Sequence, residues 1–342
     1  MSLKIKFQYW QRIIAVYILR RPSQLSFWHE KPAINSQARF DQLGPYYMTF
    51  GQKSDYQGVF DQQGVPMLDY HGQIGRQYNP IAIAQYGLAH YNLMHDSNSV
   101  FTPPRCGASR LGGVESDHRQ IFLRQANWLV DNLEPNQQGL FVWQHHFDFE
   151  YRQLLRAPWA SALAQGQGVS VLVRAWQATG QAVYLEKAKL AFLALTKPIR
   201  QGGLQDIDHQ GGIWLEEYLV SPTTHILNGF IWALWGVYDF WLATKDEAAK
   251  DLFADCVITL IKNLSRYDMG FWSRYDLSKQ AMAMLASPFY HRLHLVQLKI
   301  MADLTKQEIF GEYHKKWQAY QKNPFYCLIS FIYKMVFKLI YF

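Results

Sequence analysis

The residues most able to do chemistry in this sequence are carboxylates and bases that stand next to tyrosines. The most suggestive string is Glu216-Glu217-Tyr218. Adjacent side chains of an extended segment point to opposite faces, so only one of the two glutamates can face a cleft, and a hydrolase built from this carboxylate pair is disfavoured. Three other segments combine the same residue types: Asp69-Tyr70, His145-His146-Phe147-Asp148, and Arg274-Tyr275-Asp276 followed by Tyr290-His291.

Tyrosine as an acid or base favours a particular kind of substrate. Its hydroxyl has an ordinary pKa of about 10, which suits a substrate with a very weakly acidic proton, such as the C5 proton of a uronic acid. Removing that proton requires a base on one face of the sugar and hydrogen bonds or cations that neutralise the sugar carboxylate. Return of a proton from the opposite face inverts the sugar, whereas loss of the C4 substituent cleaves the chain by elimination.

Other chemistries have little support in the sequence. His291 and His294 could share a helix face, but no third ligand stands at a recognised spacing, so we predict no metal. A phosphate-binding glycine loop and a nucleophile elbow are both missing, and we predict no cofactor. The basic residues are scattered along the chain, which argues against a nucleic-acid partner.

Composition indicates a folded protein with an anionic partner. Of the 342 residues, 49% are hydrophobic and 18% charged, which excludes a disordered chain. Aromatic residues make up 16%, more than a core of ordinary composition needs, so many should line a surface or cleft. The net charge of +7 favours attraction of an acidic ligand over long range.

The elements that must position these residues recur four times along the chain. Each unit has a glycine, an aromatic extended stretch, a proline and then a helix, since proline is favoured in the first helical turn. The prolines are Pro80, Pro158, Pro222 and Pro288. The helices predicted to follow cover 80–96, 158–179, 222–243 and 288–304 and are apolar nearly all round. Amphipathic helices follow at 117–133, 181–197, 246–264 and 307–321, the third with Asp246 as its N-cap.

This alternation predicts a mainly α fold, an incomplete α/α toroid of four helical hairpins with short β-hairpins at its mouth. We expect an N-terminal arm at 1–63, the toroid at 64–322 and an apolar tail at 323–342. The extended stretches should meet at one mouth, with the first-turn amides of the inner helices lining a polar channel for a sugar. Gln165, Gln167 and Asn228 are the main candidates, and hydrogen bonding between helices is the alternative use of these amides.

The cysteines and the chain ends bear on location. Cys106, Cys256 and Cys327 are few and lack CxxC spacing, which argues against a disulfide scaffold. No signal peptide is recognised, so we expect a cytoplasmic location, peripheral at the inner membrane face. The tail from 324 to 342 is almost wholly apolar, with Lys334 and Lys338 four residues apart. This pattern suits a helix lying in a membrane surface, and a helix docked on the domain or in a dimer interface is the alternative.

Several of these strings together resemble one family. They are Ala157-Pro158-Trp159-Ala160-Ser161-Ala162 with Ala164-Gln165-Gly166-Gln167, Glu216-Glu217-Tyr218, Leu227-Asn228-Gly229-Phe230, Tyr275-Asp276-Leu277 and Tyr290-His291. In this order they resemble the catalytic domain of D-glucuronyl C5-epimerases, over roughly residues 60–320, in a short member of bacterial type.

The resemblance implies a helical toroid, a homodimer and cofactor-free epimerisation of glucuronate to iduronate within a heparosan-type acidic polysaccharide. By position, Glu217 and Tyr290 look like the acid/base groups on opposite faces of the sugar, and Tyr218 and Tyr275 like hydroxyls that bind the carboxylate or stabilise the enolate. Glu216 looks structural. The predicted substrate-binding residues are Gln165, Gln167, Asn228, His145, His146 and Tyr70.

One departure from the family concerns the cation. Animal members carry an arginine where this chain has Ser278, so the charge that neutralises the substrate carboxylate must come from elsewhere. Arg274, Lys279 and Arg292 are the candidates. Two other functions stay open: a polysaccharide lyase, which would share the tyrosines and the basic cleft, and a non-catalytic polysaccharide-binding protein.

Overall fold

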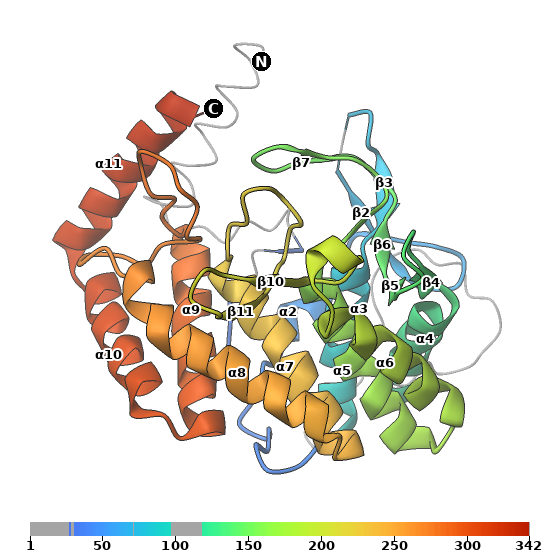
Figure 1. The fold of residues 1–342 in the computed structure, drawn as a ribbon. Helices are drawn as coiled ribbons and strands as arrows, with labels where there is room; N and C mark the ends of the chain where they lie inside the picture. Colours follow the sequence, from blue (N-terminus) through green and yellow to red (C-terminus); the bar gives the residue numbers. More distant parts are fainter. Residues whose placement is uncertain (1–26, 29–30, 71, 97–117, 342) are drawn as a thin grey trace.

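The protein folds into a mainly helical structure, as predicted, with a few short strands (Figure 1). The computed structural model describes residues 27–28, 31–70, 72–96 and 118–341. Parts of the predicted N-terminal arm, Cys106 and the predicted start of a helix at 117 lie outside these residues. The helices are α2 (Gly51–Ser54), α3 (Pro80–Met94), α4 (His118–Asp131), α5 (Ala162–Thr179), α6 (Ala182–Leu195), α7 (Leu227–Thr244), α8 (Glu247–Asn263), α9 (Pro288–Thr305), α10 (Glu308–Lys322) and α11 (Pro324–Tyr341), with 3-10 turns η1 (Ile199–Gln201) and η2 (Leu264–Tyr267).

The long helices form pairs arranged in a row. Helices α3, α5, α7 and α9 contact one another in sequence, and each packs against the helix that follows it, α4, α6, α8 or α10. Nearly every residue of α3, α5 and α7 is buried, whereas α8 and α10 bury one face. The backbones of α5 and α7 come close at Gly166 and Gly236, where a Cβ on either glycine would collide with the facing helix. The predicted contrast between fully buried and amphipathic helices therefore holds for α3, α5 and α7, whereas α9 buries only half of its residues.

Two of the four prolines begin helices and two do not. Pro80 and Pro288 start α3 and α9, capped by the side chains of Asn79 and Ser287. The predictions at Pro158 and Pro222 are wrong, because α5 begins only at Ala162 and α7 only at Leu227.

The chain after these two prolines is held outside the following helix by hydrogen bonds to other segments. Trp159 and Ala160 pair with residues 144–145, and Ser161 caps α5 by accepting from the backbone N–H of Ala164. After Pro222, the carbonyl of Thr224 accepts from Leu277 N–H, and α7 begins only at Leu227.

The strands gather at one end of the helices (Figure 1). All the pairs are antiparallel. They are β1 (Val59–Phe60), β2 (Pro66–Asp69) and β3 (Arg76–Tyr78) in one sheet, then β4 (Glu134–Pro135) with β5 (Phe141–Val142), β6 (Gln144–His145) with β9 (Trp159–Ala160), β7 (Phe149–Glu150) with β8 (Leu154–Leu155), and β10 (Gln205–Ile207) with β11 (Ile213–Leu215). The fourth expected stretch, at 270–272, forms turns beside isolated bridges at Asp268 and Arg274 instead of a strand.

The amphipathic helices begin close to their predicted positions. Asp246 caps α8 by accepting from the backbone N–H of Ala249 at 3.1 Å, as predicted. Its first turn also carries Glu247 and its last turn Lys262, the charge order that the helix dipole favours.

The apolar tail forms α11, which runs along the outer edge of the molecule beside α10 (Figure 1). By length and composition alone, it is a helix that could cross a membrane. Lys334 is buried and donates to the carbonyl of Leu285, and burial lowers its pKa to about 8. The Lys334 side of α11 therefore faces the protein. Among the side chains that the structure describes, the large apolar ones exposed on α11 are Phe325, Leu328, Ile332, Val336, Leu339 and Ile340.

Candidate active site

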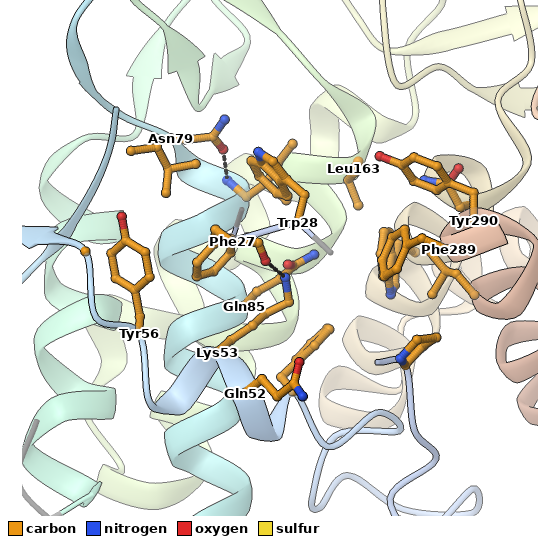
Figure 2. A pocket seen from close by; sticks show the side chains of 18 of the residues that line it. Phe27, Trp28, Gln52, Lys53, Tyr56, Asn79, Gln85, Leu163, Phe289 and Tyr290 are labelled. Atoms are coloured by element: carbon orange, nitrogen blue, oxygen red, sulfur yellow. Dashed lines mark hydrogen bonds between the residues drawn. The ribbon is translucent and has the colours of Figure 1, made fainter. Parts of the chain in front are cut away.

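A cavity of about 1100 Å³ lies where the strands meet the first turns of the inner helices. Its lining brings together Tyr70, Glu217, Tyr218, Asn228 and Tyr290, which are separated by up to 220 positions in the sequence. Figure 2 shows the labelled lining residues in two groups, with Asn79, Gln85 and Lys53 on one side and Phe289 and Tyr290 on the other. Five of the residues predicted from sequence thus share one cavity.

Glu217 is held against the first turn of α7. Its segment follows β11, and the backbone of the preceding Glu216 bonds to Leu204 and Ala162. The Nδ2 of Asn228 lies 3.5 Å from Oε2 of Glu217, a long contact. A Cβ at Gly229 would overlap the Glu217 carboxylate and come within 2.8 Å of its Cβ. The glycine in Leu227-Asn228-Gly229-Phe230 therefore leaves the space that this carboxylate occupies.

The surroundings of Glu217 favour its protonated form. Its residue surface is only 5% exposed. Burial raises its pKa to about 8, the charge of Glu216 adds to the rise, and a hydrogen bond with Tyr218 opposes it. A carboxyl group with a pKa near neutrality is the property that general acid–base catalysis requires. Burial with one carboxylate beside another is a common way to obtain it.

Three tyrosines lie close to this carboxyl group. The rings of Tyr275 and Tyr290 meet edge to face at 4.9 Å, and Tyr218 and Tyr290 both line the cavity with Glu217. Burial, followed by the charge of Glu217, holds the pKa of all three phenols well above 10. At neutral pH these hydroxyls are therefore neutral hydrogen-bond and proton donors.

Behind Glu217, Glu216 pairs with a histidine. The imidazole Nδ1 of His225 meets Oε1 of Glu216 at 2.5 Å, and its backbone N–H donates to Oε2 at 3.2 Å. The Nε2 of His225 lies 3.8 Å from Asp206, which accepts from the hydroxyl of Thr223 at 2.7 Å. Trp214 stacks on the imidazole at 4.3 Å.

These three groups are also the candidate metal ligands within the described part of the chain. Ligand atoms of Asp206, Glu216 and His225 lie within 4.8 Å of one another. However, the imidazole stands between the two carboxylates and faces one with each nitrogen. In this structure the three side chains are partners of one another, Nδ1 of His225 with Glu216 and Nε2 with Asp206.

Four predicted substrate-binding residues lie away from the cavity lining. Gln165 bonds to Phe141, Trp143 and Ala191, and Gln167 accepts from Gln85 Nε2 at 3.1 Å. These two amides make contacts between elements, the alternative use raised by the sequence. His145 is buried under Trp159 at 3.8 Å, and burial lowers its pKa to about 3. His146 is exposed and pairs with Glu134 at 2.9 Å.

The predicted cations also lie outside the cavity lining. Arg274 donates weakly to the carbonyls of Arg266 and Ser278, Lys279 is exposed, and Arg292 donates to Pro288 O. Among the described lining residues, the cation is Lys53 from α2, which donates to Phe27 O at 2.7 Å (Figure 2). A four-residue helix has too little periodicity for sequence reasoning to find it.

Two further residues were missed from sequence. Tyr151, on the turn between β7 and β8, packs its ring on Tyr218 at 4.5 Å and donates to Asp276 at 2.9 Å. Asn79 donates to the Tyr70 hydroxyl at 2.7 Å while its Oδ1 caps α3. An asparagine directly before a helix-initiating proline is a recognisable capping signal, whereas nothing local marks Tyr151.

The fold and the site define a mainly helical protein with a cavity equipped for acid–base chemistry. A family model described as the D-glucuronyl C5-epimerase C-terminus matches residues 137–319, more than half of the chain. The chain therefore belongs to this family, which confirms the resemblance found in the sequence and supports an epimerase role.

Two relatives extend the comparison. A D-glucuronyl C5-epimerase of Caenorhabditis elegans is 32% identical over 219 residues, covering 59% of this chain and 35% of the relative. An uncharacterized protein of Methanocaldococcus jannaschii is 30% identical over 202 residues, covering 58% of this chain and 64% of the relative. The matched region thus spans about a third and just under two thirds of these relatives.

Proposed function

We propose that this protein is a uronate C5-epimerase that converts D-glucuronate to L-iduronate within a heparosan-type polysaccharide. The observation that carries the proposal is the meeting of Glu217, Tyr218 and Tyr290 in one cavity of a chain that belongs to this family. Aromatic side chains along the same cavity, among them Phe149 and Trp159, offer faces on which sugar rings can pack. The excess of basic residues attracts a polyanion.

The order of the pKa values within the site supports one assignment of the two proton transfers. Glu217, with a pKa of about 8, ionises well before Tyr290, whose pKa lies above 10. The Glu217 carboxylate therefore takes the C5 proton, and the electron pair of the broken C–H bond moves into the sugar carboxyl group as an enediolate. Tyr290 returns its hydroxyl proton to C5 from the opposite face. Exchange with solvent then removes the proton from Glu217 and restores the one on Tyr290.

The remaining tyrosines act on the charge that develops. Tyr218 and Tyr275 are neutral donors, and their hydroxyls stabilise the enediolate oxygens. Donors of this kind contribute most where water is excluded. Tyr218, Tyr275 and Tyr290 are all largely buried. Lys53 supplies a positive charge in the same cavity.

The deciding experiment is NMR of heparosan incubated with the protein in heavy water. We expect deuterium at C5 and the appearance of iduronate signals without chain cleavage. An unsaturated product absorbing in the ultraviolet would identify a lyase instead. Binding of heparosan with no exchange on this or another glucuronan would overturn the enzymatic proposal and leave a polysaccharide-binding protein.

Three finer features accompany this proposal. The first is that the row of helical pairs forms an incomplete α/α toroid. The second is that the protein is a homodimer, which light scattering coupled to gel filtration would test. The third is contact of α11 with a membrane surface. Its support is the apolar stripe on α11 and an apolar groove of about 310 Å³ beside Met282 and Ile332. A helix that exposes a row of large apolar side chains gains by burying them in lipid.

Vesicle flotation tests the membrane contact. Leu328→Glu with Ile332→Glu should abolish co-flotation with anionic vesicles. Leu193→Glu, a change at a similarly exposed leucine of α6, should not. Equal flotation of the wild type and the double variant would overturn the proposed membrane contact. So would a wild-type dimer that binds no vesicles and that the double substitution converts to a monomer.

A further inference from the structure

His225 stands just before α7 in a conformation that needs support from its neighbours. Its φ is 49°, in the left-handed region that non-glycine residues seldom adopt. Tyr267 donates to its carbonyl oxygen at 2.6 Å, and Trp214 stacks on its ring. These contacts fix both the backbone and the imidazole.

Through Glu216, this fixed histidine connects the two segments that form the acid–base site. The carboxylate of Glu216 accepts from both the imidazole and the backbone N–H of His225. Glu217 is the next residue, so its Cα position follows that of Glu216. The other segment continues from His225 into Asn228 and Gly229, which bound the space of the Glu217 carboxylate.

We propose that His225 is the positioning residue of this site: by clamping Glu216, it holds the Glu217 carboxylate against the first turn of α7. The inference rests on the proposed epimerase function and adds a residue with no contact to the substrate. The clamp also keeps the charge of Glu216 next to Glu217. The other ionisable groups that face Glu217 are Tyr218, Tyr275 and Tyr290, and those that face His225 are Glu216, Asp206 and Tyr267.

The test compares two substitutions of His225 in deuterium exchange with heparosan. His225→Ala removes the donor to Glu216 and should lower kcat about 10- to 100-fold with little change in KM, because a shift of about 1 Å in a catalytic group has effects of this size. His225→Asn keeps a donor near the position of Nδ1 and tolerates a left-handed φ, so it should restore most of the rate. His209→Asn, on the exposed turn between β10 and β11, is the matched control and should behave as the wild type.

A pH profile separates positioning from a loss of stability. Glu216→Gln keeps an acceptor for His225 but removes the charge that raises the pKa of Glu217, so the acidic limb of the exchange profile should move to lower pH. His225→Asn as slow as His225→Ala in folded protein would overturn the inference. If His225→Ala does not fold, the Asn and Gln variants decide it. Absence of exchange in the wild type would instead count against the proposed function.

Discussion

Two buried carboxylates, one near each end of α7, have opposite surroundings. Asp239 is fully buried and receives two hydrogen bonds from Arg174, at 2.6 and 3.1 Å, and one from the Tyr47 hydroxyl at 2.7 Å. Glu217 is nearly as buried, but its neighbours are Glu216, a long contact to Asn228 and neutral tyrosines. In the part of the chain that the structure describes, no ion pair reaches it.

The difference separates a carboxylate used for structure from one prepared for chemistry. A bidentate arginine offsets the cost of burying Asp239 and fixes the arm residues 44–47 to α5 and α7. Glu217 has no such partner among the described residues, so its burial raises the pKa of its carboxyl group to about 8. An acid that is easily converted between its two forms at neutral pH is what proton transfer needs.

The largest expected effect is on the Glu217 side of this comparison. Glu217→Gln should lower deuterium exchange at C5 by about 10³-fold or more, since it removes the base. Glu247→Gln, at an exposed glutamate of α8, is the control and should exchange at the wild-type rate. Retention of more than a tenth of the activity by Glu217→Gln would contradict the assignment.

The same variant should not lose stability. The pKa of Glu217 is raised above its ordinary value of 4.5 in the folded protein, so the folded state keeps a proton that the unfolded chain releases. Stability therefore falls as pH rises from about 4.5 to about 8, and glutamine removes this loss. In thermal unfolding, the melting temperature of the variant relative to that of the wild type should be higher at pH 8 than at pH 5.

Next in size is the effect on the Asp239 side. Arg174→Met leaves a buried carboxylate without its cation and should lower the free energy of unfolding by about 3–5 kcal/mol, as measured by urea denaturation. Lys250→Met, which breaks the exposed pair with Glu247 at 2.9 Å, should change it by less than about 1 kcal/mol. Equal effects of the two variants would mean that the buried pair contributes no more to stability than the exposed pair.

A smaller effect is expected from crowding Glu217 without removing it. Gly229→Ala places a methyl group where the carboxylate lies, so exchange should fall about 10- to 100-fold through misplacement of the base. Gly311→Ala in α10 meets no atom within 4 Å and should leave the rate unchanged. A fully active Gly229→Ala would show that the carboxylate works from another position.

The smallest effect concerns the wild type itself. Exchange should rise about tenfold between pH 7 and pH 9, because the base must be ionised and its pKa is about 8. Tyr70→Phe, at a lining tyrosine that accepts from Asn79, should keep the same midpoint. A rate that falls over this range would mean that the protonated form of Glu217 acts first.

The sequence was a good guide where a signal is local. Helices α3 and α9 begin at their predicted prolines, and Asp246 caps α8 as its position indicates. It was a poor guide at Pro158 and Pro222, because hydrogen bonds to strand β6 and to Leu277 hold the following residues outside the helix. Such contacts come from segments distant in the chain and leave no periodic pattern.

For the site, residue types and order predicted Glu217, Tyr218, Tyr275 and Tyr290 as candidates, since an acid beside tyrosines is a chemical pattern as well as a family motif. The structure places Glu217, Tyr218 and Tyr290 in one cavity lining and Tyr275 against Tyr290. The contacts of the amides and the positions of the cations could not be predicted in this way. Gln165 has the same local sequence whether it faces a cavity or bonds to Phe141, and Arg274 stands next to Tyr275 without lining the cavity.

By itself, the sequence determined the helical class, the pairing of buried with amphipathic helices, and the residues able to move a proton, because these depend on side-chain chemistry and periodicity. Only the tertiary structure decided which buried acid is neutralised. Asp239 meets Arg174, whereas Glu217 is buried among neutral tyrosines with no cation beside it in the part of the chain that the structure describes, and that difference depends on how α5, α7 and β11 pack. The electrostatics of a buried group are set by neighbours that the chain brings together only on folding.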